Sequence, residues 1–334
     1  MPRRSRSRRH LLWLVPIGLV GVVAYGVSRL APMPAGKRFY VRYNAPTPLA
    51  TVLAKLEEKG TIRDARAYGI ALRVLGAPSV LRRGTYAFRA GDGARELNFA
   101  VSAPVRRMVR LPEMRWIRRT ADRLARENVC TRSEYIEATR DARAYRADFP
   151  FVPASGSLEG YLMPETYDLP PLTPATEVVA MQLQIFEEEI APLLKGKPDP
   201  KRILTAASLV EMEASDPMDR RRIAQVIANR LKKGMRLQID ATVLYGRQRW
   251  GRLYFKDYTG VKSPYNTYLV KGLPPGPICT PSADSVRAVL NPVPHPHVFY
   301  VAMPDGKTVY APDYDTHLKN VAERRRRIAA GEGR

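Results

Sequence analysis

The sequence predicts an α+β protein with three parts: an N-terminal transmembrane helix, a small α/β subdomain, and a larger C-terminal α+β domain. Three observations lead to this prediction. A long apolar run lies near the N-terminus, a strand–helix–helix–strand pattern follows it, and beyond residue 149 a long helical region leads to a hairpin. The chain has 334 residues, of which 45% are hydrophobic, so it is long enough to bury a sizeable core.

The N-terminal segment has the features of a membrane anchor. Residues 11–31 contain one charged residue, Arg29, and five arginines precede them within residues 1–10. A run of this length nearly spans a hydrocarbon core of about 30 Å, and the basic flank predicts a cytoplasmic tail over residues 1–10. We therefore expect a single-pass protein of the cytoplasmic (inner) membrane, with the rest of the chain on the extracytoplasmic, periplasmic side. A cleaved signal peptide is the alternative, but the run is long for one and no A-x-A cleavage site follows it.

The formal net charge of +23 indicates a protein that meets anionic partners. Because the predicted orientation places most of the chain outside the cytoplasm, we expect lipid headgroups and wall polymers as these partners, and no nucleic acid. The two cysteines, Cys130 and Cys279, and the four histidines lack metal-ligand spacing, so no zinc site is predicted. The cysteines either form a disulfide or remain two packed thiols.

The region from 38 to 148 begins with a short alternating strand, continues with two helical patterns and reaches a second strand. The segments are 39–43, 46–60, 63–76 and 84–91. This order is that of a small carbohydrate-binding module. The composition changes near Phe149, where PFVPASG predicts a domain boundary.

The second domain is expected over residues 149–325. It contains a helical region from Pro200 to Lys233 and a hairpin over residues 297–311, with Asp305-Gly306 at its turn. Residues 326–334 are predicted to form a basic tail.

Two glutamates, Glu211 and Glu213, end an almost wholly apolar helical segment that starts near Ile203. A carboxyl group in such surroundings is costly to ionise, so its pKa rises, as a general acid at neutral pH requires. The two positions lie about 200° apart around a helix, so they cannot both face one cleft. One is expected to act chemically and the other to brace the structure. The structural alternative is a glutamate that acts as a cap partner or forms an ion pair with arginines such as Arg220 to Arg222.

Four segments share their order and spacing with a known family. They are SLEGYLMPETY, SLVEMEA, NRLKKGMRLQIDATVLYG and SPYNTYLVKGLPPGPICTP. The sequence resembles the endolytic murein transglycosylases, also called YceG-like lytic transglycosylases, over most of its length. The resemblance implies a LysM-like subdomain within residues 38–148 and a YceG-like catalytic domain over 149–325.

The resemblance also implies the site residues. The catalytic glutamate of the family falls on Glu213, and Glu211 becomes the supporting carboxylate. Gln238 and Asn266 offer amides suited to an N-acetyl sugar, and three tyrosines offer flat faces for sugar rings, although ordinary core packing of the tyrosines remains open. The proposed cleft-lining set is Glu159, Gln238, Asp240, Tyr245, Tyr265, Asn266 and Tyr268. The proline-rich segment GLPPGPI, residues 272–278, is expected to form a rigid loop.

The implied activity is endolytic cleavage of the β-1,4 bond between N-acetylmuramic acid and N-acetylglucosamine in nascent peptidoglycan, with a 1,6-anhydro end as product. No metal or organic cofactor is implied. Penicillin-binding proteins and other peptidoglycan synthases are the partners that such a role implies. Two alternatives are a muramidase that hydrolyses the bond with Glu213 and Asp240, and a non-catalytic wall-binding or division scaffold.

Overall fold

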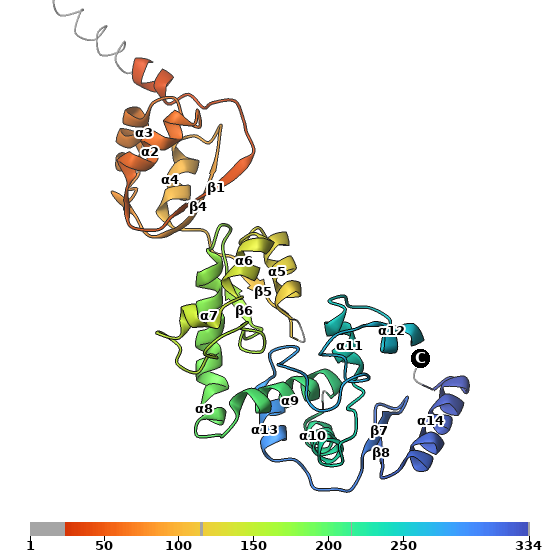
Figure 1. Cartoon of the computed structure of the whole chain (residues 1–334). Helices are drawn as coiled ribbons and strands as arrows, with labels where there is room; N and C mark the ends of the chain where they lie inside the picture. The colour runs from red at the N-terminus through yellow and green to blue at the C-terminus, as the bar shows by residue number, and fades with distance from the viewer. Residues whose placement is uncertain (1–23, 114–115, 215, 333–334) are drawn as a thin grey trace, which may run out of the picture. The chain divides into compact units, whose positions relative to one another are not determined.

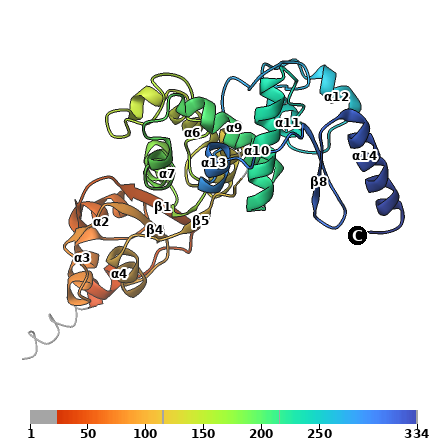
Figure 2. The same ribbon diagram turned by 90° about the horizontal axis from the view of Figure 1, so that it is seen from below.

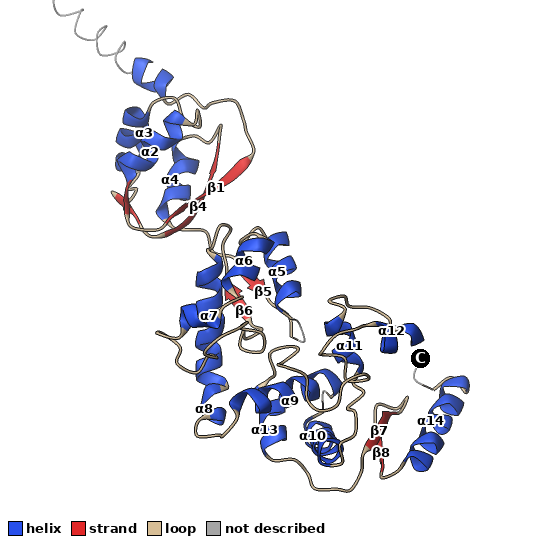
Figure 3. Cartoon of the chain, viewed as in Figure 1, coloured by secondary structure: helices blue, strands red, loops and turns tan. Residues whose placement is uncertain are grey.

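The computed structural model describes residues 24–113, 116–214 and 216–332, and it contains helices with short pairs of strands (Figures 1 and 3). This mixture confirms the predicted α+β class. The described chain forms two compact units. The first comprises the chain up to Met108 together with Asp168–Thr173, and the second comprises Val109–Tyr167 and the chain from Pro174.

The boundary between the units lies at Met108 and not at Phe149, where the composition changes. The segment before Phe149 packs within the second unit. Ala142 donates its backbone N–H to the carbonyl of Gly156, and Tyr135 donates its hydroxyl to Gln182 at 2.6 Å. The PFVPASG stretch is therefore a loop inside one compact unit, whereas the change in composition predicted a domain start at residue 149.

The first unit has the predicted strand, helix, helix, strand order. Strand β1 (Arg38–Tyr43) pairs antiparallel with β4 (Gly84–Arg89), and α2 (Leu49–Glu58) and α3 (Ala65–Val74) lie between them in the chain. Asp64 caps α3 by accepting hydrogen bonds from two backbone N–H groups. The short strands β2 (Thr47–Pro48) and β3 (Val80–Leu81) also pair, and α4 (Ala94–Ser102) follows β4. The two helices and the β1–β4 strand pair bury one core, which includes Val52, Leu53, Leu56, Tyr68, Leu72, Tyr86 and Phe88.

The second unit is mainly helical. Its first helices are α5 (Ile117–Arg126), α6 (Arg132–Ala138), α7 (Ala175–Glu189) and α8 (Ala191–Leu194), and a 3-10 turn covers Ala142–Tyr145. Strands β5 (Met108–Arg110) and β6 (Thr166–Asp168) form a two-stranded sheet. The later helices are α9 (Pro200–Glu213), α10 (Pro217–Lys232), α11 (Asp240–Gly246), α12 (Phe255–Gly260) and α13 (Ala283–Leu290). Helices α9, α10 and α13 pack against one another (Figure 2).

The helical region from Pro200 to Lys233 is two helices. Helix α9 ends at Glu213, where Ala214 takes an extended conformation, and Asp216 then caps α10, which has Pro217 at its first turn. The core beneath them is formed by Leu209, Val210, Ala214, Ile223, Ala224, Ile227, Leu237, Ile239, Ala241, Ile278 and Ala288. The break after Glu213 places this residue at a helix end.

The predicted C-terminal hairpin is present. Strands β7 (Phe299–Ala302) and β8 (Thr308–Ala311) pair antiparallel, and Gly306 supplies a left-handed φ of 80° in the turn. Helix α14 (Tyr314–Ala329) packs on both strands. Its last turn, residues 326–329, lies within the segment predicted as a basic tail. Both cysteines are free thiols.

The predicted cytoplasmic tail and residues 11–23 of the predicted transmembrane segment lie outside the described residues. The described part of that segment contains a short helix over residues 24–29. From residue 24 onward, no helix among the described residues has the length and hydrophobicity needed to cross a bilayer.

Candidate functional site

Helix α9 carries both glutamates of the SLVEMEA segment to the centre of the second unit. Asp199 caps its start by accepting a hydrogen bond from the Arg202 N–H at 2.9 Å, and Pro200 occupies the first turn. The residues from Leu204 to Glu211 are all buried. Because Glu211 and Glu213 are two residues apart, the helix directs them into different surroundings, as the helical period requires.

Glu211 joins α9 to the start of α13. Its Oε2 accepts hydrogen bonds from the hydroxyl of Ser282 at 2.6 Å and the backbone N–H of Ser282 at 3.0 Å. The Arg220 guanidinium lies 3.5 Å from Oε1. With 2% of its surface exposed and these three contacts, Glu211 is a structural carboxylate at the N-cap residue of α13.

Glu213 lies beside the C-terminal hairpin. The hydroxyl of Tyr300, on β7, donates a 2.8 Å hydrogen bond to its Oε2. Burial raises the pKa of Glu213 above its usual value; the Tyr300 hydrogen bond and the nearby Arg230 charge act against this, and the Asp240 charge adds to it. The side chain keeps partial contact with solvent. Desolvation still prevails, since protein surrounds most of the carboxyl, so the net effect of these neighbours is a raised pKa of Glu213.

Arg230 approaches this carboxyl without forming an ion pair with it. Its guanidinium donates to the carbonyls of Val298 and Leu237, and it stacks over the ring of Phe299 at 5.2 Å. Burial lowers the pKa of Arg230, while Glu213 and two tyrosines raise it. Backbone oxygens thus fix this cation, and it lowers the pKa of Glu213 only from a distance.

Asp240 faces the same region from the first position of α11. The hydroxyl of Tyr268 donates to its Oδ1 at 2.6 Å, and the hydroxyl of Tyr258 lies 3.5 Å from its Oδ2. In the LQID segment, Leu237 and Ile239 are buried whereas Gln238 and Asp240 are exposed. Gln238 has a positive φ of 51°, an uncommon conformation for this residue type.

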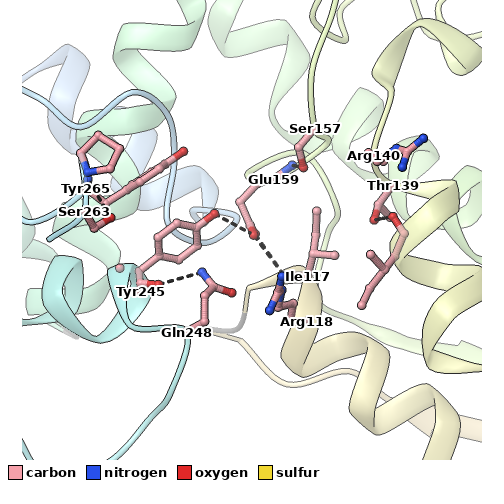
Figure 4. Close-up of a pocket in the computed structure, with 13 residues that line it drawn as sticks. Ile117, Arg118, Thr139, Arg140, Ser157, Glu159, Tyr245, Gln248, Ser263 and Tyr265 are labelled. Carbon is pink, nitrogen blue, oxygen red and sulfur yellow. Dashed lines mark hydrogen bonds between the residues drawn. The ribbon is translucent and has the colours of Figure 1, made fainter. Parts of the chain in front are cut away.

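Glu159, Tyr245 and Tyr265 line a separate cavity of about 430 Å³ in the second unit (Figure 4). The Glu159 carboxylate accepts hydrogen bonds from the backbone N–H of Ile117 at 3.2 Å and the hydroxyl of Tyr245 at 3.3 Å. Burial raises the pKa of Glu159 to about 8, against the effect of these two bonds. Thr139, Gln248 and Arg118 also line the cavity. Six of the predicted site residues thus fall into two groups: Glu213, Asp240 and Tyr268 form one, and Glu159, Tyr245 and Tyr265 form the other.

The GLPPGPI segment has no helix or strand and packs against both Gly160 and α9. Gly160 has a φ of 91°, and a Cβ atom there would lie 2.5 Å from the ring carbons of Pro277. Ile278 donates its N–H to the Ser208 hydroxyl at 3.1 Å. This close packing fixes the backbone next to Glu159.

Asn266 is placed differently from the expected sugar-facing position. It is fully buried, and its amide donates to the carbonyls of Tyr258 at 3.0 Å and Val261 at 2.9 Å. Its Oδ1 accepts the backbone N–H of Tyr268 at 3.0 Å. The side chain therefore shapes the loop that carries Tyr265 and Tyr268.

Tyr300, Arg230 and Tyr258 belong to these surroundings and were not singled out by the sequence. Tyr300 lies on a strand of the predicted hairpin. The alternation of side chains along that strand shows only that Tyr300 is on the same face as Ala302. Arg230 stands among other cations in NRLKKG. Nothing local distinguishes the two tyrosines, because Tyr300 contacts Glu213 from 87 residues away and Tyr258 contacts Asp240 from 18 residues away.

This arrangement supplies a carboxyl group with a raised pKa, a second acidic side chain and several hydroxyl groups around one partly open region. Such groups suit general acid and base catalysis on a polar, hydroxyl-rich substrate. The Glu213 region is coupled electrostatically to Asp240, which Tyr268 holds in place.

Comparisons with known proteins agree with this chemistry. A model of the YceG-like family matches residues 41–323. The endolytic murein transglycosylase of Bacillus subtilis (strain 168) is 28% identical over 322 residues, covering 90% of this chain and 89% of that protein. An endolytic murein transglycosylase of Streptococcus pneumoniae (strain D39) is 35% identical over 176 residues, which is 50% of this chain and 32% of the streptococcal protein. The crystal structure of a putative YceG-like protein of Listeria monocytogenes matches with a TM-score of 0.57 and 26% identity, over 85% of this chain and 99% of that one.

Proposed function

The chain belongs to the YceG-like family, and from this premise we propose that it is a lytic transglycosylase, a lyase that cleaves peptidoglycan. Relatives named endolytic murein transglycosylase support this activity. The observation that carries the proposal is the carboxyl of Glu213, whose pKa is raised by burial and which accepts its hydrogen bond from Tyr300 and not from an arginine.

The reaction is non-hydrolytic cleavage of the β-1,4 bond between N-acetylmuramic acid and N-acetylglucosamine. Glu213 donates its proton to the glycosidic oxygen as the bond to C1 of the muramoyl sugar breaks. The resulting carboxylate then takes the proton of the C6 hydroxyl as that oxygen bonds to C1. The products are a 1,6-anhydro muramoyl end and a free N-acetylglucosamine hydroxyl. One carboxyl group therefore completes the cycle, because the substrate supplies its own nucleophile.

Cleavage within nascent strands would end their elongation. The predicted anchor supports a site at the cytoplasmic membrane, with both units outside the cytoplasm, where strands leave their synthases. Penicillin-binding proteins are the proposed partners at that place. Protease treatment of intact spheroplasts tests the orientation: we expect digestion of the part beyond residue 31, and full protection of that part would overturn it.

The deciding experiment compares purified full-length protein with its Glu213→Gln variant on peptidoglycan glycan strands. Mass spectrometry of the products is expected to show 1,6-anhydro ends for the parent. The variant should cleave about 100- to 10,000-fold more slowly, the usual contribution of general acid–base catalysis. Glu187→Gln, on an exposed position of α7, is the matched control and should retain the parent rate. Equal rates for Glu213→Gln and the parent would exclude Glu213 as the catalyst.

A muramidase is the second candidate function, and the proximity of Asp240 to Glu213 favours it. A hydrolase would release reducing muramic acid ends in place of anhydro ends. Product analysis therefore separates the two. A non-catalytic scaffold would cleave strands no faster than its Glu213→Gln variant.

A further inference from the structure

The cavity around Glu159 takes no part in the proton transfers assigned to Glu213. It is formed by the start of α5, the SLEG segment, the end of α11 and the loop before Tyr265 (Figure 4). Its walls mix tyrosine rings with a carboxyl, an amide and hydroxyl groups. Such a lining suits a ligand that has both apolar faces and hydrogen-bonding groups.

Glu159 is arranged to bind such a ligand. Both of its hydrogen bonds, from Ile117 and Tyr245, are bonds that it accepts. At neutral pH the raised pKa keeps this carboxyl mostly protonated, and its proton is left for an oxygen of the ligand. A carbonyl oxygen, such as that of an acetamido group, is a matching acceptor.

Four aromatic rings lie in contact one after another, and two of them, Tyr245 and Tyr265, line the cavity. The Tyr245 ring lies 4.6 Å from Tyr265 and 5.8 Å from Trp116, and Trp116 lies 6.0 Å from Trp250. Arg119 stacks over both indoles, at 5.4 and 5.1 Å. Trp116 is 2% exposed whereas Trp250 is 47% exposed. A large ring held by its neighbours and open to solvent offers a preformed platform for stacking.

Helix α11 connects this cavity to the Glu213 region. It begins with Asp240, which acts on the pKa of Glu213, and it carries Tyr245 in the cavity wall. The two positions are about 7.5 Å apart along the helix axis. The segment from Tyr265 to Tyr268 makes the same connection, because Tyr265 lines the cavity and the hydroxyl of Tyr268 donates a hydrogen bond to Asp240.

We propose that the cavity around Glu159, extended by Trp250, is a second saccharide subsite that binds an N-acetylated sugar of the same glycan strand, away from the scissile bond. This inference rests on the proposed function of the Glu213 site and adds to it a place where strand length is recognised. A remote subsite favours long strands over short ones, because binding energy from distant sugars positions the reacting bond.

The test measures binding apart from cleavage. The full-length Glu213→Gln chain serves as a non-cleaving background, and a β-1,4-linked hexamer of N-acetylglucosamine is titrated into it by calorimetry. Trp250→Ala and Glu159→Ala are each expected to weaken hexamer binding about tenfold, the effect of losing one stacking or hydrogen-bonding contact of about 1.4 kcal/mol. Glu159→Gln keeps a donor and should stay within about threefold of the background.

Phe99→Ser is the matched control, because Phe99 is an aromatic residue with 84% exposure in the first unit. Its binding should equal that of the background. Melting temperatures identify any variant that has lost its fold, and Trp250 is exposed enough for its replacement to leave the fold intact. Unchanged hexamer affinity in both Trp250→Ala and Glu159→Ala would overturn the subsite. That result would leave the proposed function standing if Glu213→Gln still abolishes cleavage.

Discussion

The hydroxyl of Tyr300 donates a 2.8 Å hydrogen bond to Oε2 of Glu213, and this contact joins strand β7 to the C-terminal end of α9. It stabilises the ionised form of this carboxyl and so lowers its pKa, which burial raises. The negative charge of Asp240 has the opposite effect, because it raises the pKa of Glu213. The balance between these neighbours sets the pH range in which Glu213 can act as an acid.

Tyr300→Phe should move the alkaline limb of the pH–rate profile to higher pH. The acid must carry its proton in the free enzyme, so kcat/KM falls as the pH rises through the pKa of Glu213. Removal of the hydrogen bond takes away an interaction that lowers this pKa. The profile of kcat/KM against pH on glycan strands measures the shift. Tyr40→Phe, in the first unit, should leave the profile unchanged, and an alkaline limb at lower pH in Tyr300→Phe would contradict the prediction.

Asp240→Asn should move the same limb in the opposite direction. The charge of Asp240 raises the pKa of Glu213, so a neutral amide lowers it and activity is lost at lower pH. Asparagine retains an oxygen that can accept the Tyr268 hydroxyl, which limits the structural change. The products should still be 1,6-anhydro ends. A complete loss of cleavage, with reducing ends from the parent, would instead support the two-carboxylate muramidase.

Glu211→Ala should destabilise the protein by about 3 kcal/mol, because it leaves buried donors on Ser282 and the Arg220 guanidinium without their carboxylate. Urea unfolding followed by circular dichroism measures the change. Glu187→Ala, on an exposed face, is expected to stay within about 0.5 kcal/mol of the parent. A Glu211→Ala chain as stable as this control would show that the α9–α13 connection contributes little.

Gly160→Ala should be more harmful than Gly156→Ala, although both glycines have positive φ angles of 91° and 87°. A methyl group at 160 collides with Pro277, whereas nothing lies within 4 Å of the corresponding position at 156. We expect a loss of about 3 kcal/mol or more at 160 and about 1 kcal/mol at 156. The difference between their urea midpoints checks the packing of GLPPGPI beside Glu159, and equal midpoints would refute it.

Local sequence patterns determined which segments form helices, strands and the hairpin turn. The alternation of FYVRY and GTYAFRAG predicted β1 and β4, and Asp305-Gly306 predicted the hairpin turn. The apolar run before Glu211 predicted α9, and the helical period separated Glu211 from Glu213 before any contact was known. These features repeat over a few residues, so the chain itself encodes them.

Only the tertiary structure decided which side chains meet. Tyr300 lies 87 residues beyond Glu213 in the chain, and many tyrosines have the same local pattern. Asn266 and Gln238 both carry amide side chains and both lie in segments that resemble the family, yet Asn266 is buried and Gln238 is exposed. Packing also unites residues 109–148 with the second unit, where composition alone suggested a boundary at 149. Contacts between distant segments depend on how whole helices and strands pack to fill the core, and the local periodicity of the sequence does not specify that packing.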